Sequence, residues 1–275
     1  MKKCLYVLSA VAAVLLGACS KEKYGDGDAH GKVSFYNASY TLNAFLGASS
    51  SQQKVLLALT PDGKQSVPMA GSATPYFNAC TDCGSRYDYP RVTARNTIPW
   101  VSFDYYTPGP YTVRLYLNSI DSAMQYTFPV NVTQDQSSTY ALSDSLGAWH
   151  VTAVRHEAPA TAGNIRLRLV QLCPDADSVN LRIGNRLLTG MQNLPYGAVS
   201  QTIDYPLAAD STLKLRLFNA RDTLTTIART DLPASPRQSY LLILRNYSKP
   251  HQYTDKQGRT VSIIAAGTLD TRKLE

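Results

Sequence analysis

The residue pair whose spacing could most directly do chemistry is Cys80 and Cys83, separated by Thr81 and Asp82. A Cys-x-x-Cys pair can ligate zinc, act as a redox dithiol or close a local disulfide. A structural zinc site needs four ligands, and the sequence around the pair supplies no second pair and no His-x-His. A redox pair would open a helix in an α/β setting, whereas this pair lies among Gly, Asn, Asp and Ser. We therefore predict a disulfide, and neither a metal nor a cofactor.

Other residue types give no catalytic pattern. The sequence contains four scattered histidines, His30, His150, His156 and His251. Asp175 and Asp177 follow Pro174, which is ordinary turn chemistry. There is no Gly-x-Ser-x-Gly elbow, His-Glu-x-x-His, phosphate loop or EF-hand loop. We expect that the protein is not an enzyme.

Basic residues that alternate with leucine or isoleucine give the clearest indication of binding. Residues 165–169, 181–183 and 213–217 follow this alternation, which in a strand sends the apolar set to the core and the basic set to the opposite face. If these strands share one sheet, five basic side chains lie on one solvent face: Arg166, Arg168, Arg182, Lys214 and Arg216. Such a face would suit phosphate, carboxylate or an acidic partner, because arginine binds these groups through two parallel hydrogen bonds. The alternative is a solvated face whose arginine stems cover the apolar layer.

A long insertion, residues 60–98, is the second candidate binding element. It contains four aromatic residues, Tyr76, Phe77, Tyr87 and Tyr89. A loop of this length in a compact domain is usually functional or disordered, and exposed tyrosines could contact sugars or a protein. The alternative is that these aromatics form a small core beneath the loop.

The N-terminal segment indicates how the protein is attached. Lys2 and Lys3 precede an apolar run, residues 5–16, that is typical of a secretory signal and too short for an ordinary transmembrane helix. Residues 16–19, Leu-Gly-Ala-Cys, resemble the bacterial lipobox, whose cysteine is acylated before cleavage. The resemblance implies removal of residues 1–18 and a palmitate-type lipid anchor at Cys19, since several buried acyl chains hold a protein stably.

The residue after the lipobox bears on the membrane. Ser20 replaces the aspartate associated with inner-membrane retention, so the resemblance points to the cell outer membrane. The orientation, periplasmic or surface-exposed, stays open. Residues 19–31 contain several glycines and no periodicity, which is typical of a flexible tether.

From residue 32 onward the pattern is one of short strands. Tyrosine is abundant at 18, and charged residues make up only 17%, which favours half-exposed strands over helices. Turn residues separate the expected strands, and no helical periodicity extends over twelve residues. We predict an all-β fold with two tandem antiparallel β-sandwich domains, residues 32–157 and 158–275, and a candidate linker at 157–164.

The two predicted domains share four landmarks in the same order. Residues 33–39 match 167–173, 99–100 match 195–197, 112–115 match 212–215, and 140–142 match 240–242. The C-terminal copy, Leu-Val-Gln-Leu-Cys-Pro-Asp-Ala-Asp at 169–177 followed by Pro-Tyr-Gly at 195–197, resembles a family of Ig-like domains of unknown function. These domains occur in tandem in envelope lipoproteins of Bacteroidota. In the first half Tyr40 replaces the usual proline and Trp100 the usual tyrosine. The resemblance implies an Ig-like fold and an envelope location, and no activity.

Charge is unevenly distributed along the chain. The formal net charge is +7 and falls to +5 without Lys2 and Lys3. Residues 32–157 carry eight basic and eight acidic side chains, whereas residues 158–275 carry fifteen and nine. A basic half can bind polyanions. Because the protein is expected to be exported, we do not expect nucleic acid to be among them. We predict a non-catalytic module that binds a glycan or an acidic envelope partner. The alternative is a structural subunit of a surface assembly, in which exposed edges pair with neighbouring chains.

Overall fold

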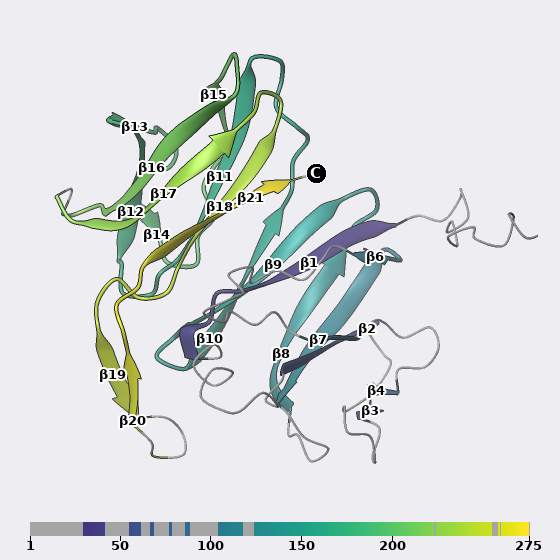
Figure 1. Ribbon diagram of the computed structural model, residues 1–275. Coiled ribbons are helices and arrows are strands. Elements are labelled where there is room, and N and C mark those ends of the chain that lie inside the picture. Colours follow the sequence, from purple (N-terminus) through teal and green to yellow (C-terminus); the bar gives the residue numbers. More distant parts are fainter. Residues whose placement is uncertain are drawn as a thin grey trace, which may run out of the picture.

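The computed structural model describes residues 30–41, 55–61, 67–68, 77–78, 86–88, 104–117, 124–222, 224–254, 258 and 260–274. Every named element within these ranges is a β-strand (Figure 1). The predicted all-β sandwich fold is therefore confirmed. Over the same ranges, no helix has the length and apolar character needed to cross a membrane.

The N-terminal half forms two four-stranded sheets and a short hairpin. The first sheet has the order β10-β9-β1-β6, with bounds Ala148–Arg155, Ser137–Ser145, Gly31–Asn37 and Asp104–Tyr106. The second has the order β5-β2-β7-β8, with bounds Arg86–Asp88, Val55–Pro61, Gly109–Leu117 and Met124–Val132. The hairpin joins β3 (Val67–Pro68) and β4 (Phe77–Asn78).

The C-terminal half repeats this arrangement. Its first sheet has the order β15-β11-β18-β21, with bounds Ile203–Pro206, Asn164–Leu172, Ser239–Arg245 and Thr268–Leu274. Its second has the order β13-β12-β16-β17, with bounds Arg186–Leu187, Ser178–Ile183, Ser211–Asn219 and Thr226–Ala234, and β14 (Leu194–Pro195) pairs with β12. A hairpin of β19 (His251–Thr254) and β20 (Thr260–Ile263) projects from this half (Figure 1).

Strand pairing supports the internal repeat. Thr112 on β7 lies opposite Pro129, and Thr212 on β16 lies opposite Pro233, so one of the four matched landmarks, 112–115 with 212–215, occupies equivalent positions in the two halves. One pairing in each half differs from the antiparallel expectation, because β1 pairs in parallel with β9 and β11 pairs in parallel with β18. Within the described residues, no strand of one half pairs with a strand of the other.

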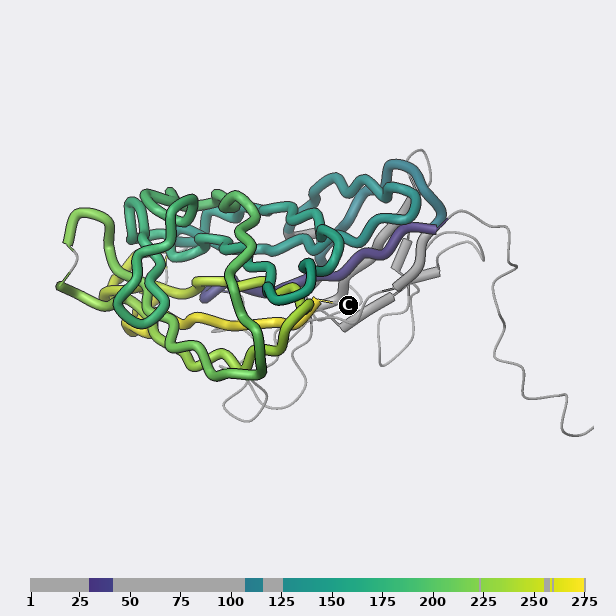
Figure 2. The backbone as a smooth tube through the Cα atoms, turned by 90° about the horizontal axis from the view of Figure 1, so that it is seen from above, coloured from purple at the N-terminus to yellow at the C-terminus, as the bar shows by residue number. Residues whose placement is uncertain are grey.

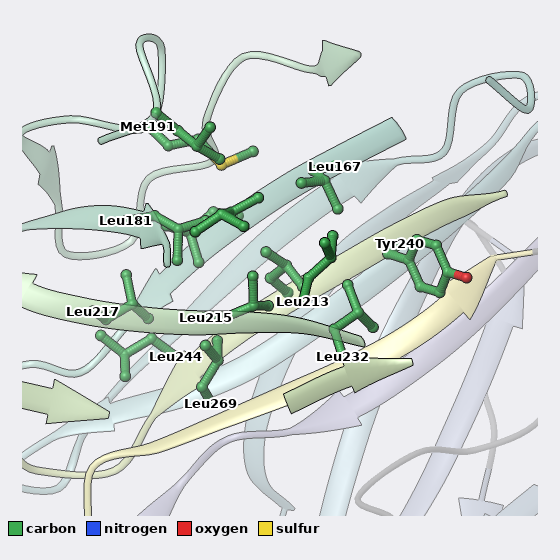
Figure 3. Close-up of a cluster of buried hydrophobic side chains, with 14 of the residues drawn as sticks. Leu167, Leu181, Met191, Leu213, Leu215, Leu217, Leu232, Tyr240, Leu244 and Leu269 are labelled. Atoms are coloured by element: carbon green, nitrogen blue, oxygen red, sulfur yellow. The ribbon is translucent and has the colours of Figure 1, made fainter. Parts of the chain in front are cut away.

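Each half has an apolar core between its two sheets. In the C-terminal half, alternate residues of β16 (Leu213, Leu215 and Leu217) face inward and meet Tyr240 and Leu244 of β18 (Figure 3). Phe35, Val113 and Phe128 contribute to the corresponding core of the N-terminal half. Period-two burial of this kind is what the alternating sequence predicts.

A third core joins the two halves. Tyr36 and Ala141 of the N-terminal half pack with Val170, Leu241 and Ile243 of the C-terminal half. Strand β18 is buried at every position, because its odd-numbered apolar residues enter this junction while Tyr240, Leu242 and Leu244 enter the core of its own half. A continuous apolar run is typical of a strand covered on both faces. The β10-β9-β1-β6 and β15-β11-β18-β21 sheets therefore pack against each other.

The junction also contains a buried charged group. The hydroxyl of Tyr36 donates a hydrogen bond to Asp270, whose carboxylate pairs with the Arg245 guanidinium at 2.5 Å. Burial, reinforced by the Asp270 charge, raises the pKa of Tyr36 well above its ordinary value. Figure 2 shows β1, in purple, running beside the yellow C-terminal strand β21, which brings these side chains together.

A second polar group closes one end of the junction. The carboxylate of Asp144 accepts hydrogen bonds from the Ser39 hydroxyl at 2.6 Å and from the Thr41 amide at 3.1 Å. The Tyr247 hydroxyl donates to the Asp144 carbonyl and accepts from the Leu146 amide. These contacts hold the turn after β9 against the C-terminal half.

Candidate functional site

Three arginines form a row across the outer face of the β13-β12-β16-β17 sheet. Arg182 on β12 lies directly opposite Arg216 on β16, and Arg216 lies directly opposite Arg229 on β17. Leu181 and Leu217, one position along, point into the core, so the strand period sends the arginines outward. We call Arg182, Arg216 and Arg229 the arginine row.

The row carries positive charge that no carboxylate neutralises within the described residues. Other arginines of the same half are paired: Arg166 with Asp204 at 2.8 Å, Arg221 with Asp177 at 3.1 Å, and Arg245 with Asp270 at 2.5 Å. In contrast, Arg182, Arg216 and Arg229 form no ion pair with any described residue. Like charges directly opposite each other destabilise a sheet, so this arrangement has a cost in the free protein.

Apolar side chains border the row at one end. The guanidinium carbon of Arg182 lies 4.8 Å from the ring centroid of Phe218, which is only 6% exposed beneath it. Such a cation–π contact contributes about 0.5–1 kcal/mol at an exposed site. Leu187 on β13 lies opposite Arg182 and is 37% exposed. Arg182 is therefore held in position, whereas Arg216 and Arg229 are exposed.

The five basic residues expected on one face occupy two different sheets. Arg182, Lys214 and Arg216 share the outer face just described, where Lys214 lies opposite Asp231. Arg166 and Arg168 lie on β11, in the other sheet, and the expectation of a single five-residue face is wrong. The alternation is correct within each strand, but it does not specify which strands become neighbours.

Arg166 and Arg168 hold the connection between the halves. The same side of β11 carries Val170 in the junction core. Arg166 donates to the Ala158 carbonyl at 2.6 Å, and Arg168 donates to the Arg155 carbonyl and lies 3.8 Å from the Glu157 carboxylate. These contacts attach the first residues of the predicted linker, Glu157 and Ala158, to β11 of the C-terminal half.

Sequence reasoning missed Arg229. Residues 228–232, Ala-Arg-Thr-Asp-Leu, place Ala228 and Leu232 in the core. The alternation is the same signal that identified the other basic strands, but a single arginine beside Asp231 did not stand out. Arg229 belongs to the arginine row because it lies directly opposite Arg216, and this strand register is seen only in the structure.

The remaining predicted site residues have no described side chains. Cys19, Tyr76, Cys80, Cys83 and Tyr89 lie outside the described residues. Phe77 falls in β4 and Tyr87 in β5. Lipidation, the disulfide and the aromatic contact surface stay predictions.

One cluster contains the residue types of a cysteine nucleophile, in an unsuitable order. The buried Cys173 thiol donates to one oxygen of Asp175 at 3.1 Å, and His251 contacts the other oxygen at 2.9 Å. The carboxylate lies between thiol and imidazole, so the histidine has no contact through which to take the thiol proton. Burial and the Asp175 charge raise the pKa of Cys173, which disfavours the thiolate.

The same carboxylate has a structural role. It accepts hydrogen bonds from the Ser248 amide at 2.7 Å and the Lys249 amide at 2.8 Å. Despite its partial burial, these backbone bonds together with His251 lower the pKa of Asp175. Asp175 therefore joins the turn after β11 to the segment before β19. Among the described residues, no group of His, Cys, Asp and Glu is arranged to hold a metal ion.

Comparison with known proteins gives distant structural likenesses only. No family model and no curated protein matches the chain. Among solved structures, it is similar to the fimbrial anchor protein Mfa2 from Porphyromonas gingivalis, with a TM-score of 0.24, 10% identity, and coverage of 84% of this chain and 94% of that one. It is also similar to a protein of Bacteroides fragilis with a proposed role in cell adhesion, with a TM-score of 0.19, 10% identity, and coverage of 82% and 85%. At these TM-scores neither likeness carries an argument about function.

Proposed function

We propose that this protein is a non-catalytic binding module of the cell envelope, anchored in the outer membrane through a lipid on Cys19, and that the arginine row is its docking face for an acidic partner. The observation that carries the proposal is the register Arg182–Arg216–Arg229 on a sheet face with no described carboxylate bonded to it. A bound anion would relieve the repulsion that the free sheet contains.

The chemistry of the row favours carboxylate or phosphate groups. Each guanidinium can form two parallel hydrogen bonds to either group, and these charge-assisted bonds are stronger than neutral ones. The sheet beneath is fixed by a packed leucine core, so binding orders the arginine side chains but need not reorder the backbone (Figure 3).

The proposal is tested by charge reversal. The double variant R216E/R229E of the full-length lipoprotein should lose retention on immobilised acidic polymers and on envelope fractions, with unchanged far-UV circular dichroism. The matched control is R221E/R237E, because Arg221 and Arg237 are exposed in the same half, lie outside the row and give the same change in charge.

Two results would overturn this function. Equal retention of the double variant and the wild type would remove the row as the docking face. A stoichiometric protein partner that co-purifies equally with both proteins from gently solubilised membranes would favour the alternative of a structural subunit.

A further inference from the structure

We propose that the occupant of the arginine row is a linear acidic polysaccharide with one carboxylate per sugar residue, which lies across the strands. This inference rests on the proposed function and specifies its ligand. The row runs perpendicular to β12, β16 and β17, since its members are direct cross-strand partners.

The spacing of the row is set by the sheet. Neighbouring strands are about 4.7–4.9 Å apart, and the core beneath the three strands prevents this interval from changing. A polyuronate presents carboxylates at the interval of one sugar ring, which is similar to one strand spacing. The long arginine stems can reach carboxylates that project to either side of the polymer. Three successive sugars would therefore engage Arg182, Arg216 and Arg229 together.

An acidic peptide fits the row less well. Side chains on one face of an extended peptide recur at about 6.6–6.8 Å, about 2 Å wider than the strand interval, so the arginine stems must bend to meet them. Peptides also gain affinity from main-chain hydrogen bonds at a sheet edge. Strands β12 and β16 are hydrogen-bonded to neighbours on both sides, and a peptide added to the free edge of β17 would run along that strand and not across the row.

An anionic membrane surface also fits less well. Such a surface binds a broad basic patch, and basic residues near it act additively. Here Lys214 lies opposite Asp231, two residues along the strands from Arg216 and Arg229 and on the same face. The arginines of β12, β16 and β17 thus lie in one line, which suits a single polymer chain.

The apolar end of the row gives the polymer a further contact. Leu187 continues the row beyond Arg182 and remains 37% exposed. The C–H face of a sugar ring can cover such a side chain, and Phe218 stiffens the adjacent arginine. A fourth sugar would occupy this position.

The experiment is calorimetric titration of the full-length lipoprotein, in a neutral detergent, with a galacturonate hexamer. We expect binding that weakens with salt and is absent with the fully methyl-esterified hexamer. R216Q and R229Q should each weaken binding about tenfold or more, because each loses a charge-assisted pair of bonds. R221Q should bind like the wild type, and R216K should be intermediate because it keeps the charge but not the paired geometry.

The outcomes separate this inference from the proposed function. Absence of hexamer binding, together with row-dependent binding to poly-glutamate or to phosphatidylglycerol vesicles, overturns the polysaccharide but keeps the docking face. No row-dependent binding to any acidic probe overturns both. Equal weakening by R221Q and R216Q would mean that net charge alone attracts the polymer, and would also overturn the inference.

Discussion

The hydroxyl of Tyr36 on the first strand of the chain donates a hydrogen bond to Asp270 on the last strand, across the junction between the two halves. Asp270 is also the ion-pair partner of Arg245. Because burial of a charged pair is favourable only when its hydrogen-bonding capacity is satisfied, this contact links the stability of one half to that of the other.

Tyr36→Phe should lower the free energy of unfolding by about 1–3 kcal/mol, because it leaves the partly buried Asp270 carboxylate with one donor fewer. Chemical denaturation followed by circular dichroism would measure the change. Tyr205→Phe is the matched control, since Tyr205 packs beside the C-terminal core without such a bond. Equal effects of the two substitutions would contradict the assigned role of Tyr36.

Leu215→Ala should lower the unfolding midpoint of the N-terminal half, although Leu215 belongs to the core of the other half. A buried leucine truncation costs about 2–5 kcal/mol, and the shared junction transmits this loss. Both tryptophans, Trp100 and Trp149, lie in the N-terminal half, so their fluorescence reports that half alone. A fluorescence midpoint unchanged by the substitution would show that the halves unfold independently.

Stability should fall as the pH drops below about 6.5. Burial, together with the charges of Arg272 and Arg168, lowers the pKa of His156 from 6.5 to about 4. The unfolded chain therefore binds the proton more readily than the folded one throughout that window, and acid favours unfolding. The expected loss from His156 is about 2 kcal/mol between about pH 7 and about pH 4.5.

His156→Gln isolates this contribution. Glutamine can keep a hydrogen bond to the Thr139 hydroxyl, which His156 contacts at 2.8 Å. The variant should lose less stability than the wild type over the same pH range in parallel denaturation curves. An identical pH dependence would exclude His156 as its source.

Cys173 should resist alkylation in the folded protein at mildly alkaline pH. The thiol is buried beside Asp175, and the resulting rise in its pKa keeps it protonated. Iodoacetamide labelling followed by mass spectrometry should modify Cys173 only after denaturant is added. Rapid labelling of the native protein would mean that the turn after β11 opens readily.

Cys19→Ser should remove the acyl mass from the N-terminal part of the protein and leave residues 1–18 attached. The reason is that the lipobox cysteine, which the variant lacks, is acylated before cleavage. Cys4→Ser, within the predicted signal, is the control and should leave both properties unchanged. An acyl mass that persists in the Cys19 variant would refute lipid anchoring at this residue.

The alternating sequence predicted strand faces well, and strand neighbours poorly. Each basic residue of 213–217 lies on the solvent side, as period two requires. Arg168 has the same local pattern but lies in the other sheet, because sheet membership depends on contacts distant in the sequence.

The internal repeat also shows where local matching is insufficient. Tyr140 pairs with Phe35, and Tyr240 pairs with Leu167. The strand register therefore makes Phe35 the equivalent of Leu167. The sequence match had aligned Val33 with Leu167, so it was displaced by two residues. A shift of two residues keeps every side chain on its face, so hydrophobic patterning alone could not reveal it.

The apolar run at residues 240–244 indicates how its strand is packed. Strands covered on one face alternate, whereas β18 is apolar at every position from 240 to 244 because both of its faces are buried. The same run thus indicated that a further layer covers the sheet, although it could not identify the other half as that layer.

The placement of β1 has a mechanical consequence. The chain enters the fold at Gly31, and β1 is hydrogen-bonded on both sides, to β6 and to β9. A pull along this strand from its N-terminal end loads the bonds of both ladders in shear, so they must fail together instead of opening one at a time. The sheet that receives the load packs on the C-terminal half, so tension applied at the arginine row would reach β1 through stacked layers.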